Sequence, residues 1–160
     1  MDLILWRHAE ATEHPDARLA RPGDAQDLAR RLTPRGEKHA ARMAAWLDRQ
    51  LASGTRILAS PAQRTEQTVQ ALGRKYRLRD ELAPGADALA LLALVQWPDA
   101  KAPVLVVGHQ PTLGRVIARL LGLTQEECAV KKGAIWWLHQ RQRGGARQTV
   151  LLTVQTPELL

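Results

Sequence analysis

Cysteine is almost absent from this sequence, since Cys128 is the only one among 160 residues. A single thiol excludes an internal disulfide framework and fits a reducing compartment, and we assign Cys128 no chemical role. Long hydrophobic runs are also missing: the longest, ALALLALV at 88–95, is too short to cross a bilayer. The N-terminus places Asp2, Arg7 and Glu10 around a very short apolar run, which is not the pattern of a signal peptide. We therefore expect a soluble, cytoplasmic protein.

Aromatic residues are scarce, and their scarcity helps to decide which partners the net positive charge could bind. The chain has 23 Lys and Arg against 16 Asp and Glu, a formal net charge of +7 that attracts anions in general. The cations are scattered, and Tyr76 is the lone aromatic residue within the most basic stretch, RKYRLR at 74–79. Grooves for single-stranded nucleic acid interleave cations with several aromatic side chains. We therefore expect neither a nucleic acid nor a membrane partner, and assign the charge to a solvated surface that favours anionic substrates.

Short aliphatic runs alternate with helical patterns along the whole chain. The runs at 2–6, 56–59 and 103–107 are bounded by polar residues or glycine, as buried parallel strands are. The length predicts one domain, residues 1–160, with a core that needs neither disulfides nor metal. Two segments that flank Gly144 and Gly145, AIWWLHQ and RQTVLLTV, predict an antiparallel hairpin at the edge of the sheet.

Helix boundaries are marked by proline and glycine. Thr33 and Pro34 predict the N-cap and first residue of a helix whose apolar face covers the sheet. Ser60 and Pro61 predict a second start, for a helix that runs to about residue 73, and Pro111 predicts a third, for a helix that stops at residue 122. The fold class that follows is α/β: a three-layer α/β/α sandwich with a mainly parallel central sheet and an antiparallel edge hairpin near the C-terminus.

Four polar residues fall where such a sheet binds ligands, beyond the carboxyl ends of its strands. His8, preceded by Arg7, and His109 each follow an aliphatic run within one or two residues, and Arg64 lies in the first turn of the next helix. We expect them to converge on one anion. A phosphoryl group in transfer needs fixed cations and amide donors, and the planar guanidinium of arginine matches two phosphate oxygens. Because Pro111 lacks an N–H, the amides of Gln110 and Thr112 are the expected donors at the third helix.

The two histidines suit different roles in such a site. An imidazole is largely unprotonated near neutral pH, so His8 can offer a lone pair to phosphorus, which makes covalent catalysis available without a metal. His109 would act as a hydrogen-bond donor or cation toward the same oxygens. A metal site made of His8, Glu10, His14 and His109 matches no compact ligand spacing, so we expect no metal and no cofactor. The other histidines lack a strand-end position, and we expect surface or helix-face roles for them: His14, His39 and His139.

Four segments, taken in order and spacing, resemble the histidine phosphatase superfamily with its phosphoglycerate mutase-like fold, and within it the small SixA-type phosphohistidine phosphatases. The segments are RHAEA at 7–11, RRLTPRGEKHAARMAAWL at 30–47, ILASPAQRTEQT at 57–68 and VLVVGHQPTLG at 104–114. The resemblance implies that His8 is the phospho-accepting nucleophile. It also implies that the remaining three residues of the predicted site form the phosphate pocket: Arg7, Arg64 and His109.

Two departures from the wider family concern the shape of the site. Ala9 stands where most members have glycine, as is usual in the small branch, and the long insertions that roof the mutase active site are missing. The resemblance thus implies an open, shallow site suited to phosphate on a protein surface. It also implies a proton donor in DELAPG at 80–85, where Glu81 is the best match; a solvated loop carboxylate is the alternative.

The function that these residues and the resemblance imply is a metal-independent protein phosphohistidine phosphatase with a phosphohistidine enzyme intermediate. Its partner would be a phosphorylated protein, such as a histidine-containing phosphotransfer domain. Two alternatives stay open: a phosphatase for small phosphate esters, and a non-catalytic phosphate-binding module. The second is disfavoured because binding alone does not require a nucleophile in line with the phosphate.

Overall fold

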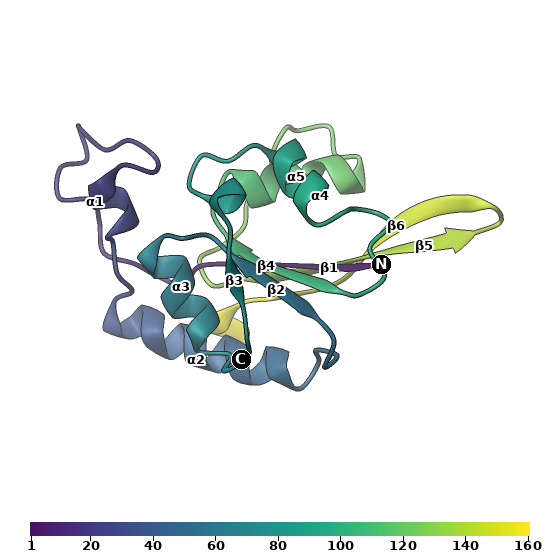
Figure 1. The fold of residues 1–160 in the computed structure, drawn as a ribbon, viewed down its shortest axis with the longest axis horizontal. Helices are drawn as coiled ribbons and strands as arrows, with labels where there is room; N and C mark the ends of the chain where they lie inside the picture. The colour runs from purple at the N-terminus through teal and green to yellow at the C-terminus, as the bar shows by residue number, and fades with distance from the viewer.

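A single mixed sheet organises the molecule, as the computed structural model, which describes residues 1–160, shows (Figure 1). Its six strands lie in the order β3-β2-β4-β1-β5-β6. The strands are β1 (Asp2–Arg7), β2 (Arg56–Ala59), β3 (Arg77–Leu78), β4 (Val104–Gly108), β5 (Ile135–Arg143) and β6 (Ala146–Gln155). Neighbours from β3 to β1 pair in parallel, whereas β5 and β6 run antiparallel at one side. The predicted α/β fold class is confirmed.

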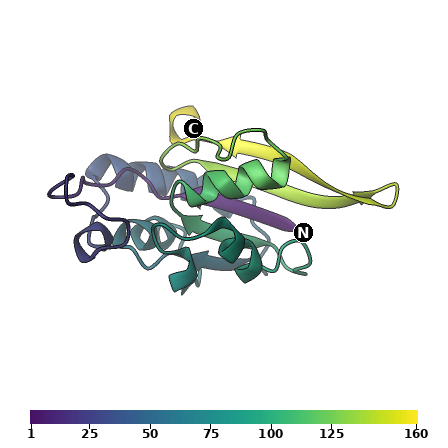
Figure 2. The same ribbon diagram turned by 90° about the horizontal axis from the view of Figure 1, so that it is seen from above.

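Helices cover both faces of this sheet (Figures 1 and 2). One face carries α2 (Pro34–Asp48) and α3 (Gln63–Gln70), and the other carries α4 (Ala88–Leu94) and α5 (Thr112–Leu121). The remaining helical elements are α1 (Ala25–Leu28) and the 3-10 turns Asp80–Leu82 and Pro157–Leu159. None of the helices combines the length and the apolarity that crossing a bilayer requires.

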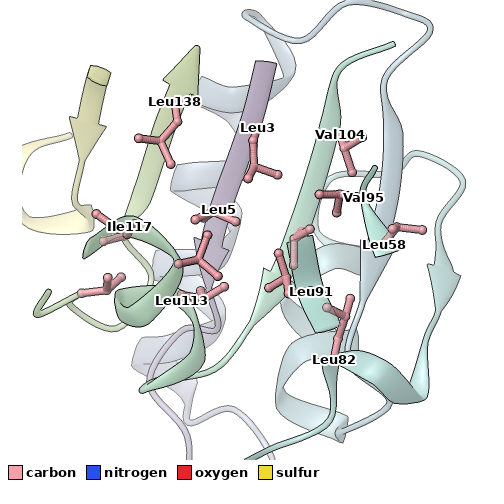
Figure 3. Packing of buried hydrophobic residues seen from close by; sticks show 14 residues of the cluster. Leu3, Leu5, Leu58, Leu82, Leu91, Val95, Val104, Leu113, Ile117 and Leu138 are labelled. Atoms are coloured by element: carbon pink, nitrogen blue, oxygen red, sulfur yellow. The ribbon is translucent and has the colours of Figure 1, made fainter. Parts of the chain in front are cut away.

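The core is split between the two faces because strand side chains alternate. Leu3 and Leu5 of β1 pack with the α4 and α5 side, where Leu91 and Ile117 join them (Figure 3). The intervening residues of β1 and β4 pack on the other side, against Met43 and Leu47 of α2 and Val69 of α3; they are Ile4, Trp6, Leu105 and Val107. Burial on both faces explains why the parallel strands read as continuous aliphatic runs.

The predicted helix signals hold at α2 and shift at the other two helices. Thr33 caps α2 through its side chain, which accepts a hydrogen bond from the Gly36 amide at 3.0 Å, and Pro34 is the first helical residue. The next helix, α3, begins at Gln63 and ends at Gln70, so it is shorter at both ends than predicted. Ser60 is not its cap, because Ala62 holds the N-cap position; the Ser60 hydroxyl accepts from the Ala62 amide at 3.3 Å and also contacts a histidine side chain. At α5 the shift is one residue, since the helix begins at Thr112.

The predicted hairpin is confirmed as β5 and β6. Gly144 and Gly145 form its turn, and both have the positive φ, 59° and 79°, that tight two-residue hairpins require. The hairpin extends past the start of β1, because Asp2 pairs with His139 while the β5–β6 ladder continues to Arg143. Figures 1 and 2 show its tip standing clear of the helical layers.

Candidate active site

The neighbouring parallel strands β1 and β4 bring the two predicted site histidines together. Arg7, the last residue of β1, lies opposite Gly108 at the end of β4, so His8 and His109 follow at the same edge of the sheet. Their ring centroids are 5.4 Å apart. Arg64 is the second residue of α3 and lines the same pocket, whose volume is about 390 Å³. The four residues that the sequence indicated are therefore gathered at one place.

His8 is held as a neutral imidazole with a defined lone pair. Its Nδ1 lies 2.8 Å from the carbonyl oxygen of Ala9, and because a carbonyl oxygen only accepts, Nδ1 carries the proton. The lone pair is thus on Nε2. The ring is 4% exposed, and burial first, then the proximity of His109, holds its pKa well below the usual histidine value. His8 remains uncharged at neutral pH, as a nucleophile must.

His109 is also neutral in the free protein. Burial, followed by the positive charges of Arg64 and Arg7, lowers its pKa to about 3. Its Nε2 lies 2.7 Å from Oγ of Ser60, whereas its Nδ1 is buried without a protein partner. Ser60, at the end of β2, therefore holds this ring from the side opposite to Nδ1.

Each arginine of the pocket is held by a carbonyl oxygen on one side of its guanidinium. Nη1 of Arg7 donates to the carbonyl of Val130 at 2.7 Å, and Nη1 of Arg64 donates to that of Asp27 at 2.7 Å. Burial lowers the pKa of both guanidinium groups, but from a value so far above neutrality that both remain cations. The Nε atoms of both are buried and have no protein partner.

These unmatched donors are the chemical signature of the site. Three buried side-chain nitrogen atoms in the whole molecule lack a hydrogen-bond partner, and all three belong to this pocket: Arg7 Nε, Arg64 Nε and His109 Nδ1. Leaving a buried donor unpaired costs about 1–3 kcal/mol, so such atoms call for a ligand. Two fixed cations and a ring nitrogen around the lone pair of His8 can bind a tetrahedral oxyanion.

Glu81, the predicted proton donor with a solvated loop carboxylate as the alternative, is not among the residues that line this pocket. It is exposed and pairs with Arg79, whose Nη2 lies 2.9 Å from the carboxylate. The hydrogen bond from Arg79 lowers the pKa of Glu81, which is the wrong direction for a general acid at neutral pH. Two other carboxylates line the pocket, those of Glu13 and Asp27.

Gln110 does line the pocket, but its side chain is engaged elsewhere. Its Oε1 accepts from the amide of Gly114 at 2.6 Å and its Nε2 donates to the carbonyl of Cys128 at 2.9 Å. Its backbone N–H has no acceptor within the protein and remains for the predicted phosphate contact. The predicted role of Gln110 thus depends on the main chain.

Sequence reasoning missed several residues of the pocket. His14, expected at the surface, lines it instead, with a side chain that is 6% exposed and that bonds to Asp24 at 3.3 Å. Asp27 and Ser60 were missed because neither stands in a pattern that marks chemistry, although Asp27 contacts Arg64 and Ser60 contacts His109. Further cations around the opening are Arg21, Arg30 and Lys132. No group of three or more His, Cys, Asp or Glu side chains is placed to hold a metal ion.

The family model for the histidine phosphatase superfamily (branch 1) matches residues 3–87, which include Arg7, His8 and Arg64. The chain belongs to the histidine phosphatase superfamily. Phosphohistidine phosphatase SixA of Escherichia coli (strain K12) is 35% identical over 128 residues, which are 75% of this chain and 74% of that protein. The SixA homolog of Haemophilus influenzae is 26% identical over 76% of this chain and 78% of its own.

The structural comparison extends the family relationship through the second half of the chain. A structure of the protein histidine phosphatase SixA complexed with tungstate has a TM-score of 0.74 and 27% identity, and the match covers 99% of each chain. The match therefore includes β4 and His109, which follow the segment of the family model. The histidines and arginines gathered in the pocket all lie within the part of the chain that this match covers.

Proposed function

We propose that the protein is a metal-independent phosphohistidine phosphatase that acts on phosphorylated proteins through a phosphorylated His8. The observation that carries the proposal is the state of His8: an uncharged ring with its proton on Nδ1 and its lone pair on Nε2, in a pocket that it shares with the buried Arg64 and the half-buried Arg7. The similarity to SixA proteins supports phosphohistidine as the substrate class.

In the first step the substrate phosphoryl group would lie against Arg7, Arg64 and His109. Nε2 of His8 attacks phosphorus, a new P–N bond forms, and the P–N bond of the substrate breaks with its electron pair going to the leaving imidazole. Charge on the three equatorial oxygens is stabilised by the guanidinium donors, including both unmatched Nε–H groups. If the Ser60 hydroxyl donates to Nε2 of His109, the proton of this neutral ring is on Nδ1, and the Nδ1–H of His109 is a further donor to the phosphoryl oxygens.

In the second step water attacks the phosphorus of phospho-His8. The P–N bond breaks, its electron pair returns to Nε2, and inorganic phosphate is released. The hydrogen bond from Nδ1 to the Ala9 carbonyl keeps the ring in one orientation throughout, so the same atom serves as nucleophile and leaving group. The cycle balances without metal or redox chemistry.

Protonation of the leaving group does not need a dedicated carboxylic acid for this substrate. Phosphoimidazole expels a nitrogen that solvent can protonate, whereas an alkyl ester must expel a poor alkoxide. Asp27 is held by arginines, and Glu81 is exposed and paired with Arg79. The role of Glu81 as a proton donor therefore stays a prediction. Solvent, or Glu13, which lines the pocket, could supply the proton instead.

The charge of the site supports a protein partner. Arg21, Arg30 and Lys132 lie around the pocket and would attract an acidic, phosphorylated surface, such as that of a histidine-containing phosphotransfer domain. A small phosphate ester would use the same phosphate contacts, but few of the residues that line the pocket are hydrophobic and could bind the remainder of such a molecule.

The test compares three substrates in the presence of a chelator: a protein phosphorylated on histidine, p-nitrophenyl phosphate and an alkyl phosphate. We expect the phosphohistidine protein to have the highest kcat/KM and labelled phosphate to be trapped on wild-type protein in an acid-labile, base-stable bond. His8→Ala should abolish both, while His39→Ala, a histidine outside the pocket, should abolish neither. A preference for the alkyl phosphate would favour the small-ester alternative, and binding without turnover would favour the binding module.

A further inference from the structure

Asp27 is a nearly buried carboxylate that belongs to no recognised motif. It lies on α1, within the connection between β1 and α2, and is 7% exposed. Acidic side chains are rarely buried unless they are paired. Its partners therefore explain its position.

The main partner of Asp27 is Arg64, which is itself 3% exposed. Asp27 contacts this guanidinium twice: its carbonyl oxygen accepts from Nη1 at 2.7 Å, and its carboxylate lies 3.4 Å from Nη2. Both terminal nitrogen atoms are thus engaged on one side of the fork. The Nε–H remains without a protein partner, in a residue that lines the pocket beside His8.

A second cation shares the same carboxylate. Nη1 of Arg30 lies 3.1 Å from Asp27, and the amide of Gly23 donates to it at 2.9 Å. Burial alone would raise the pKa of Asp27, but the Gly23 amide and the two guanidinium groups outweigh it, so the pKa lies below the usual value. Asp27 is therefore ionised at neutral pH and stands between two arginines of the pocket.

An arginine side chain has several rotatable bonds, and its fork has to be immobilised before it can stabilise a transition state at full strength. Holding both Nη atoms fixes the plane and the direction of the guanidinium. The Nε–H, and an Nη hydrogen that does not bond to Asp27, are then oriented toward the phosphoryl group before the substrate binds.

We propose that Asp27 is a positioning residue, which acts through Arg64 by fixing its guanidinium so that the Nε edge meets the transferring phosphoryl group. This inference rests on the proposed function, because it assigns Arg64 to phosphoryl transfer. It gives the α1 segment a part in the reaction although Asp27 itself touches no reacting atom.

The direction of the effect separates positioning from simple electrostatics. Removing a negative charge from beside an anion site strengthens anion binding if the arginine stays in place. Weaker binding and slower turnover after the same change would report a displaced guanidinium. Asp27→Asn is the suitable variant, because it keeps the shape of the side chain and loses the charge.

The experiment is a double-mutant cycle of Asp27→Asn and Arg64→Ala, with kcat and KM measured on a phosphohistidine protein and on p-nitrophenyl phosphate. We expect Asp27→Asn to lower kcat by roughly 10- to 100-fold, as misplaced catalytic groups do. The double variant should be no worse than Arg64→Ala alone within about threefold, since a residue acting through Arg64 has nothing left to position. Asp16→Asn, in the same connection and paired with Arg18, is the matched control and should behave as wild type.

Three outcomes would overturn the inference. Independent losses that multiply in the double variant would show that Asp27 does not act through Arg64, and wild-type kcat in Asp27→Asn would show that it does not act at all. If wild-type protein turned over no phosphorylated probe, the proposed function would fail, and the Kd for inorganic phosphate would then decide. Weaker phosphate binding by Asp27→Asn would support positioning, and equal or tighter binding would refute it.

Discussion

At the scale of single residues, the site combines two permanent cations with two imidazoles that stay neutral. Burial keeps both histidines uncharged, and the positive charges of the nearby arginines act in the same direction. An uncharged His8 keeps its lone pair, and an uncharged His109 can donate one hydrogen bond without repelling the arginines. The electrostatics of the free protein are thus already arranged for an incoming dianion.

The low pKa of His109 predicts a stability effect of definite sign. In the unfolded chain its pKa is about 6.5, whereas in the folded protein it is about 3. Between these values the unfolded state binds a proton that the folded state does not. The contribution of His109 to folding stability is therefore fully present above about pH 6.5 and is lost as the pH falls. His109→Gln removes this contribution, so its Tm should fall less than that of wild type between pH 7 and pH 5. Equal slopes of Tm against pH would mean that His109 titrates normally in the folded protein.

Arg7 should not be replaceable by lysine. Its Nη1 donates to the Val130 carbonyl while its Nε–H stays available for a ligand, and the single nitrogen atom of an ammonium group cannot reproduce both contacts in this geometry. We expect Arg7→Ala to lower kcat/KM by roughly 10² to 10³, as loss of comparable donors does, and Arg7→Lys to recover only part of it. Steady-state kinetics on p-nitrophenyl phosphate would show this. Activity of Arg7→Ala within twofold of wild type would remove Arg7 from the site.

The sequence was sufficient to predict the site residues that stand at strand ends, but not the residues that hold those side chains in place. His8, His109 and Arg64 could be predicted because parallel strands align their carboxyl ends. Asp27 and Ser60 could not, since the site residues that they contact, Arg64 and His109, are distant from them in sequence and a lone Asp or Ser has many ordinary uses. Lowered pKa values were equally out of reach, because they depend on burial.

At the scale of secondary-structure elements, the position of α2 matters to the site through a glycine. A Cβ at Gly36, in the first turn of α2, would lie 2.0 Å from the carbonyl oxygen of Glu10, two residues beyond His8. The helix therefore packs directly on the backbone of the segment that carries His8. Thr33 reinforces this contact, because its backbone amide bonds to the carbonyl of Glu10 at 3.0 Å.

Gly36→Ala should consequently damage both stability and turnover. Overpacking of this kind typically costs about 1–3 kcal/mol, and the shift of Glu10 would be passed to His8. Gly54→Ala is the matched control, because a Cβ there meets no atom within 4 Å. Thermal unfolding and kcat/KM of both variants would test this. Wild-type kinetics in a destabilised Gly36→Ala protein would show that α2 supports the fold without positioning His8.

The elements that the sequence predicted are those long enough to carry a pattern. The α2 and α5 helices have caps and an apolar face, so their existence and approximate bounds followed from periodicity. In contrast, β3 has two residues and α1 has four, too few for any period to show. The α4 helix, ALALLAL, is apolar throughout and has a single buried residue, Leu91, so its pattern did not separate helix from other buried structure.

At the scale of the whole molecule, two groups of cations each line a pocket. One is the active site, and the other is a groove of about 560 Å³ along β2 and β3 that contains none of the predicted site residues. Because β3 pairs only with Leu58 and Ala59, the rest of the β2 edge has no strand beside it. The groove is lined by five cations, Arg56, Arg74, Lys75, Arg77 and Arg79. Cations on an open strand edge discourage pairing with another molecule.

Neutralising this edge should therefore promote self-association. The double variant Arg56→Thr with Arg77→Thr removes two of these charges and introduces residues that favour strands. We expect it to form oligomers at concentrations where wild type does not, with kcat/KM unchanged in the dilute protein. Arg115→Thr with Arg119→Thr, on α5, removes the same charge and should stay dispersed. Light scattering over a concentration series distinguishes the two.

The β5–β6 hairpin has a practical consequence that follows from its direction. Its tip, at Gly144 and Gly145, is exposed and lies past the start of β1 (Figure 1). The pocket that holds His8 and His109 lies beyond the other end of that strand. The tip is thus a natural handle: a fluorophore or an immobilisation tag inserted there would sit at the far end of the enzyme from arriving substrate. A surface tethered through this turn would present every molecule with its reactive end facing solution.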